Sequence, residues 1–146
     1  MRWTSGGQAV TCVLRAIGTL FDVDAFLAES ALETEPAFHR GEVQLAGLSG
    51  GAKHAASGFN ASVSAAGVDD LAAQIRDAVQ FLNVHESELR RLGSYPGVEE
   101  VCLDFAVRRR EGAVQSEIFP AELLWLAGAL DIDLIVTHYV VTDQKS

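Results

Sequence analysis

The residues best suited to chemistry lie in the segment Phe38-His39-Arg40-Gly41-Glu42. A histidine that titrates near neutral pH, a permanent cation and a carboxylate stand almost side by side, and such groups can bind an anion or shuttle a proton. Functional groups concentrate on loops that rigid elements hold, so this segment is a candidate binding site. The simpler interpretation is a turn in which Gly41 supplies backbone freedom and Arg40 pairs with a nearby acid.

A second candidate is the stretch 49–58, which is rich in glycine, serine and alanine and carries Lys53 and His54. A loop of this kind can close over a ligand, although it can equally be a connection without a function. The two segments together give the predicted binding residues, which are His39, Arg40, Glu42, Lys53 and His54.

The sequence predicts no catalytic residue, no metal ligand and no cofactor. Ser49-Gly50-Gly51 lacks the glycine spacing and the lysine of a phosphate-binding loop, and no nucleophile elbow occurs. Cys12 and Cys102 are too far apart in the chain for a CxxC zinc motif. The histidines include no pair at helical ligand spacing.

The chain is acidic, because its 146 residues carry a formal net charge of -9. This charge does not suit nucleic acid or an anionic membrane. It suits a basic partner, since complementary charge speeds encounter, although acidity can also serve solubility alone. We interpret Arg108-Arg109-Arg110, the only basic run, as a solvated turn that protects a strand edge.

We expect a reduced, cytoplasmic protein. Two cysteines do not make a disulfide framework, and each lies in an apolar run, where a free thiol behaves as a small hydrophobe. Whether the two are neighbours in space stays open. The segment 1–7 lacks the apolar region of a secretory signal, and no window of about 18 apolar residues is present.

Hydrophobic periodicity and turn residues divide the chain into alternating strands and helices. Asp22 and Asp70 are predicted to cap helices, and Pro120 suits a first helical position. The apolar alternation of 59–66 is typical of an antiparallel strand with one buried face. The predicted strands are 9–18, 41–48, 59–66, 99–108, 114–118 and 132–141, and the predicted helices are 23–30, a long one that follows Asp70, 86–92 and 120–130.

This order predicts one α+β domain over residues 1–146, with frayed tails at 1–8 and 142–146. We expect a mostly antiparallel sheet of five to six strands, with helices packed mainly on one face. The strands 99–108 and 114–118 are expected to form a hairpin. The last strand is apolar on both faces, so we expect it at the centre of the sheet.

The chain resembles the bacterial family catalogued as domain of unknown function 4279. The resemblance covers most of the chain and is carried by a first strand that ends at Gly18, the segment 22–27, Pro36 followed by Arg40-Gly41-Glu42, the later helices and the last apolar strand. It implies no established activity, so no functional residue follows from it.

Three functions are compatible with these features. The favoured one is a small, non-catalytic acidic binding module that sequesters a basic protein partner, in the manner of an immunity protein. The first alternative is a small-molecule-binding protein or small enzyme that uses the segment 38–42 and the loop 49–58. The second is an oligomeric accessory protein with an exposed apolar patch or a sheet edge that pairs in a dimer. A homodimer is compatible with all three.

Overall fold

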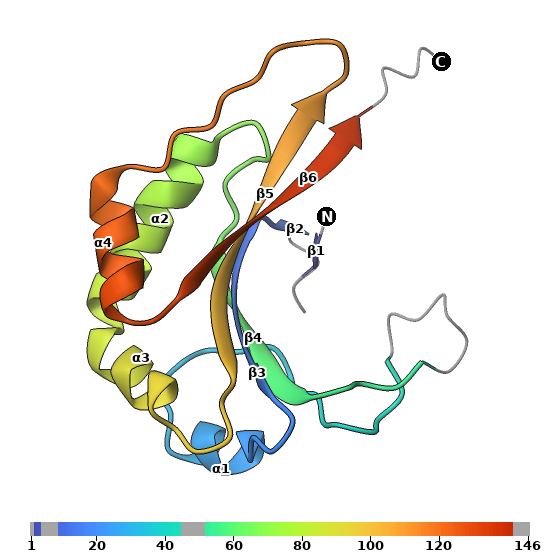
Figure 1. The fold of residues 1–146 in the computed structure, drawn as a ribbon, viewed down its shortest axis with the longest axis vertical. Helices are drawn as coiled ribbons and strands as arrows, with labels where there is room; N and C mark the ends of the chain where they lie inside the picture. Colours follow the sequence, from blue (N-terminus) through green and yellow to red (C-terminus); the bar gives the residue numbers. More distant parts are fainter. Residues whose placement is uncertain (1, 4–8, 45–51, 142–146) are drawn as a thin grey trace.

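A mixed sheet with helices on one side forms the body of the protein (Figure 1). The computed structural model describes residues 2–3, 9–44 and 52–141. The strands are β1 (Arg2–Trp3), β2 (Ala9–Val10), β3 (Cys12–Gly18), β4 (Ser57–Ser64), β5 (Glu100–Arg110) and β6 (Asp133–Val141). The helices are α1 (Val23–Ala28), α2 (Leu71–Val84), α3 (Glu86–Gly93) and α4 (Ala121–Ala129).

The sheet has the strand order β4-β3-β5-β6, and β1 pairs separately with β2. The strand β3 is antiparallel to both β4 and β5, whereas β5 and β6 are parallel. The predicted α+β class is confirmed. The predicted sheet of five to six mostly antiparallel strands matches only roughly, because the described residues form a mixed sheet of four strands with a separate pair.

The expected hairpin of 99–108 with 114–118 is wrong. Residues 114–118 form no strand, and the chain instead passes through α4 before it returns as β6. A helical crossover of this kind is what joins parallel strands. The side chain of Gln115 makes the hydrogen bonds to the β5 backbone that a paired strand would make. It accepts from the Arg110 N–H at 3.2 Å and donates to the Arg108 carbonyl at 2.7 Å.

The last strand is at an edge of the sheet, and its predicted central position is wrong. Its apolar composition comes from packing on β5 and α4, not from neighbours on both sides. The predicted strand 41–48 is reduced to a single bridge between Val43 and Lys53, and residues 45–48 lie outside the described part. In the predicted loop 49–58, residues 49–51 also lie outside it, and Ser57 and Gly58 already belong to β4. Of the predicted frayed tails, only β1 is described, paired with β2.

The core lies between one face of the sheet and the helices, which all pack on that side (Figure 1). Alternate residues of the two central strands supply it, among them Leu14, Leu103 and Phe105, none of which has any exposed surface. The stripe of α2 packs onto them through residues at helical spacing, as predicted. The predicted caps are confirmed, because the Asp22 and Asp70 carboxylates accept the backbone N–H groups of residues 25 and 73 at 3.1 Å.

Two glycines allow the backbone at the end of β3 to pack closely against the segment that leads into β5. Gly97 has a φ of +88°, and a Cβ there would collide with the carbonyl oxygen of Leu20. A Cβ on Gly18 would collide with the carbonyl oxygen of Gly97. Only glycine permits both the left-handed backbone and this close approach. No helix of the described residues is long and apolar enough to cross a membrane.

We predict opposite effects of two glycine substitutions. Gly97→Ala should lower the free energy of unfolding by about 1–3 kcal/mol, because a side chain is strained in the left-handed region and meets the backbone. Gly128→Ala should raise it by about 0.5–1 kcal/mol, because Gly128 lies inside α4 with open space around it. Urea unfolding measures both changes. Equal effects of the two substitutions would contradict the role of the close approach.

Candidate functional site

The two predicted binding segments lie against each other and form a two-stranded arm, defined here as residues 38–44 and 52–58. Bridges join Phe38 to Gly58 and Val43 to Lys53. Between them, the Gly41 N–H donates to the carbonyl of His54 at 2.9 Å. The backbone therefore brings together residues that the sequence placed in two separate candidates.

His39 is the chemical centre of this arm. Its Nδ1 lies 2.8 Å from the Glu42 carboxylate and its Nε2 lies 2.8 Å from the Asp24 carboxylate of α1. The hydrogen bonds to Glu42 and Asp24 raise the pKa of His39, and the hydrogen bond from His39 lowers the pKa of Glu42. A doubly donating imidazolium has no free lone pair, so this arrangement holds a proton and does not abstract one.

Asp24 is the partner that sequence reasoning missed. It lies on the first turn of α1, and no local pattern connects it to His39. The sequence indicated only that it follows the helix cap at Asp22. Its contact ties the arm to the body of the protein.

The other predicted binding residues do not converge on His39. Arg40 and Lys53 are exposed, and the Arg40 backbone N–H donates to the Ser57 hydroxyl at 2.9 Å. The ring of His54 stacks on Phe38, with ring centroids 4.7 Å apart. None of these side chains lines either of the two hollows described below.

We predict that His39 makes stability depend on pH. Its folded pKa is raised above 6.5, so its contribution is full below that pH and is lost as the pH rises through the folded pKa. The lowered pKa of Glu42 gives a contribution that is present above pH 4.5 and is lost as the pH falls through the folded value. Urea unfolding from about pH 5 to about pH 9 should show the loss at the alkaline end in the parent chain and not in His39→Gln. His54→Gln is the matched control, and an identical loss in His39→Gln would contradict the assignment.

A polar network crosses the sheet on the face that points away from the helices. Arg15 donates from Nε to the Asn60 side-chain oxygen at 3.1 Å, and its guanidinium lies 3.4 Å from the Asp104 carboxylate. The hydroxyl of Thr137 donates to the same carboxylate at 2.7 Å. One side chain from each strand of the sheet takes part, so the network links all of them.

Sequence reasoning missed this network. The signal that could have indicated it was one charged residue in the middle of each of two apolar strands. These residues are Arg15 in β3 and Asp104 in β5. Asp104 is only 4% exposed, and a buried carboxylate requires charged or hydrogen-bonding partners. Because its bonds are made within the sheet, we interpret the network as a support of strand pairing.

The two cysteines lie on neighbouring strands but on opposite faces of the sheet. Cys12 pairs with Phe105 and faces the core, whereas Cys102 pairs with Arg15 on the other face. Neither cysteine forms a disulfide. Burial raises the pKa of Cys102, which keeps the thiol protonated and unsuited to nucleophilic attack.

We predict that neither thiol reacts with iodoacetamide in the folded protein near neutral pH. Cys12 is fully buried and Cys102 is 1% exposed, so the reagent reaches neither, and the thiolate form of Cys102 is disfavoured. Mass spectrometry should show no adduct in the native state and two adducts after unfolding in urea. Rapid native labelling of Cys102 would contradict the burial of this face.

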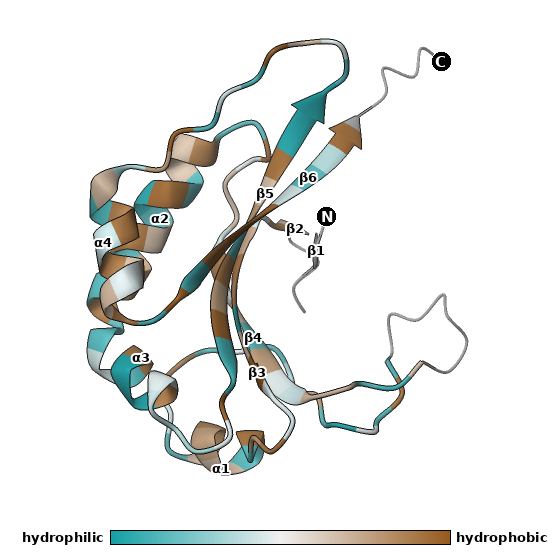
Figure 2. Ribbon diagram, in the orientation of Figure 1, coloured by the Kyte–Doolittle hydropathy of each residue, from teal (hydrophilic) through white to brown (hydrophobic). Residues whose placement is uncertain are grey.

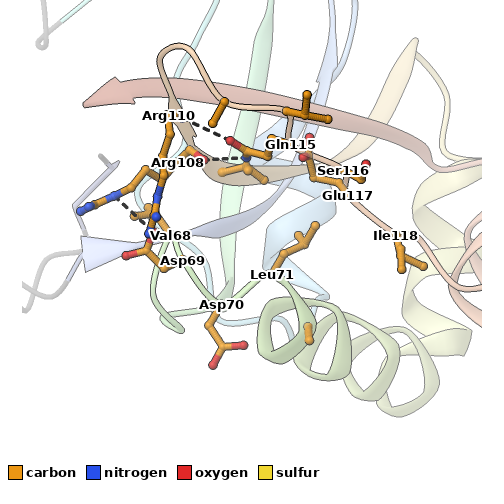
Figure 3. Close-up of a pocket in the computed structure, with 14 residues that line it drawn as sticks. Val68, Asp69, Asp70, Leu71, Arg108, Arg110, Gln115, Ser116, Glu117 and Ile118 are labelled. Carbon is orange, nitrogen blue, oxygen red and sulfur yellow. Dashed lines mark hydrogen bonds and ion pairs between the residues drawn. The ribbon is translucent and has the colours of Figure 1, made fainter. Parts of the chain in front are cut away.

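The first hollow lies between the N-terminal end of α2, the end of β5 and the segment that leads to α4 (Figure 3). Its volume is about 540 Å³. Leu71 and Ile118 contribute apolar walls, and Gln115 bridges to β5 at its rim (Figure 3). The predicted turn at Arg108-Arg109-Arg110 is wrong, because β5 extends to Arg110. Arg108, which was also the last residue of the predicted strand 99–108, pairs with Asp69 at 3.2 Å. Oε2 of Glu117 is buried there without a hydrogen-bond partner in the described residues.

The second hollow is an acidic groove of about 300 Å³ at the ends where β5 and β6 begin. Parallel strands start at the same edge of a sheet, and here the pairing of Cys102 with Asp133 brings their beginnings together. The turn after α4 adds Asp131, which adopts a φ of 56°. The carboxylates that line the groove are those of Glu99, Glu100, Asp131 and Asp133.

The four carboxylates of the acidic groove form no ion pair with a basic side chain in the described residues. Glu99 accepts a hydrogen bond from the Thr19 N–H at 2.6 Å, and the described residues that line the groove include no basic one. Within the same described residues, no group of three His, Cys, Asp or Glu side chains could hold a metal ion. The acidic groove of the described residues is therefore not a metal site of three or more such ligands.

Comparisons with protein-family models, with curated proteins and with solved structures find no match to this chain. The resemblance to domain of unknown function 4279 therefore stays a prediction.

Proposed function

We propose that this chain is a non-catalytic binding module that engages a basic protein partner through the acidic groove. The observation that carries the proposal is that Glu99, Glu100, Asp131 and Asp133 line one hollow, in which no basic side chain of the described residues forms an ion pair with them. Like charges held close together repel each other, and a bound cation relieves the repulsion. The repulsion among these carboxylates lowers the stability of the free protein, and the binding of a basic partner relieves it.

The shape of the acidic groove favours a basic side chain over a metal ion. Four acidic residues line a volume of about 300 Å³, and no three His, Cys, Asp or Glu side chains of the described residues could hold a metal ion. A guanidinium or ammonium group on a flexible stem can reach several carboxylates in turn. A net charge of -9 would steer a basic partner toward the protein before contact.

The chemistry of the other candidate groups supports a role without catalysis. Both ring nitrogens of His39 are engaged by carboxylates, and the pKa of the buried Cys102 thiol is raised. Neither group is prepared to act as a base or nucleophile. Two cysteines that form no disulfide also fit a reducing compartment, which supports the cytoplasmic location that we propose.

Small-molecule binding is the second candidate function. The pairing of the segment 38–44 with 52–58 favours it, because a ligand could meet His39, Glu42 and His54 on one arm. The first hollow has a volume within the range of ligand sites, although the arm does not line it. A small ligand on the arm would leave the acidic groove without a role, so substitutions in the groove separate the two functions.

We predict that neutralising the acidic groove weakens capture of a basic partner. The double variant Glu100→Gln with Asp133→Asn should lose affinity on the order of tenfold at low salt, because the opposing charges are removed. The same variant should be at least as stable as the parent, since repulsion is relieved. The measurements are a pull-down from the native lysate at low and high salt, read by mass spectrometry, and urea unfolding.

The matched control is Glu29→Gln with Glu33→Gln, which removes the same charge from exposed positions outside the groove. A basic protein that the parent and the control capture, and the groove variant does not, supports the proposal. Equal capture by all three chains, or no salt-sensitive basic protein captured by the parent, contradicts it.

A further inference from the structure

The two edges of the sheet differ in whether they are covered. At the β4 edge, Phe38 exchanges two backbone hydrogen bonds of 3.0 Å with Gly58, and the Glu35 N–H donates to the Asn60 carbonyl at 2.9 Å. At the β6 edge, no strand or loop of the described residues pairs with the outer side. Half of the β6 backbone groups therefore lack a partner within the sheet.

The β6 edge also lacks the features that keep edge strands apart. From 134 to 141 it contains no lysine, arginine, carboxylate or proline. It runs for nine residues, and Val140 is 54% exposed. Natural proteins protect such edges with charges, proline, bulges or a covering segment, and a long apolar edge without them pairs with another strand.

The sequence of β6 is complementary to itself when two copies run antiparallel. Full overlap centres the pair on Thr137 and places Leu134 opposite Val140, Ile135 opposite Tyr139 and Val136 opposite His138. Cross-strand pairs of apolar, β-branched and aromatic side chains stabilise an antiparallel sheet. Asp133 lies opposite Val141, so no carboxylate faces another across the pair.

The low charge of the β6 edge and the covered β4 edge favour a second copy of this chain, and not a different protein, as the strand that pairs with β6. Two chains of net charge -9 repel each other over most of their surface, but this edge is almost without charge. The β4 edge is covered at Gly58 and Asn60, so β6 is the more open edge of the four-stranded sheet among the described residues. One open edge gives a closed two-fold pair, whereas two open edges would give a fibre.

The helix before β6 offers apolar surface at the same side of the molecule. The helix α4 packs against both α2 and β6, and Figure 2 shows apolar residues along it and along the first half of β6. Leu124 is 50% exposed and Trp125 is 72% exposed. Strand pairing alone buries less than the roughly 800 Å² per partner of a stable interface, and a second apolar surface supplies area.

We propose that two copies of this chain associate through β6, antiparallel about a two-fold axis at Thr137, to form one continuous eight-stranded sheet. The inference is independent of the acidic groove, because its hydrogen bonds are those of the β6 backbone. It gives the chain a defined oligomeric state and assigns a role to the uncovered edge.

The experiment compares two single-cysteine additions, Thr137→Cys and Val140→Cys. At the axis, the two Thr137 Cα atoms lie about 4.5–5.5 Å apart, which is within the range of a disulfide. The two Val140 residues are six positions apart along the pair, or roughly 20 Å. Mild oxidation followed by a non-reducing gel should therefore cross-link Thr137→Cys several-fold more than Val140→Cys. The buried Cys12 and Cys102 are the same in both variants.

Light scattering of the parent chain should give twice the 15.6 kDa mass of one chain. If Thr137→Cys does not fold, the double variant Ile135→Cys with Tyr139→Cys should cross-link between chains, whereas each single variant should not. A monomeric mass at all concentrations, equal cross-linking at 137 and 140, or an edge occupied by a different protein would overturn the proposal.

Discussion

The parallel pairing of β5 with β6 is the constraint on which the rest of the structure depends. Residues 101–107 of β5 are all buried, so this strand lies at the centre of the protein. Its antiparallel neighbour β3 can follow from local turns, but a parallel neighbour requires a crossover. That crossover is α4, which covers the core on the helical side. The same connection leaves β6 at the edge and places its first residues beside those of β5.

The acidic groove follows directly from this pairing. Glu99 and Glu100 stand at the start of β5, and Asp131 and Asp133 stand at the start of β6. Had the two strands run antiparallel, these pairs of acids would lie at opposite ends of the sheet. If the repulsion among these acids had no function, a single lysine in the acidic groove would make the protein more stable. Proteins accept such costs at binding sites, where a partner supplies the missing charge.

Local features were predictable from the sequence, and long-range pairing was not. Asp22 and Asp70 cap their helices as expected, because capping involves residues only three positions apart. The segment 114–118 was predicted to be a returning strand, yet it forms no strand, and its residues Val114 and Ile118 are exposed. The edge position of β6 was not predicted from the sequence. A strand that packs on one neighbouring strand and one helix has the same apolar composition as a strand at the centre of a sheet. The contacts of Asp24 with His39 and of Arg15 with Asp104 join segments that no local pattern connects.

The proposed pair and the acidic groove together determine how a partner would be presented. In an antiparallel pair, the beginnings of the two β6 strands lie at opposite ends, roughly 25 Å apart for nine residues. Each begins at Asp133, so one groove lies toward each end of the continuous sheet. The assembly would then bind two basic segments at a fixed spacing. A partner with two such segments would gain effective concentration from the second contact, whereas a partner with one would bind each groove independently.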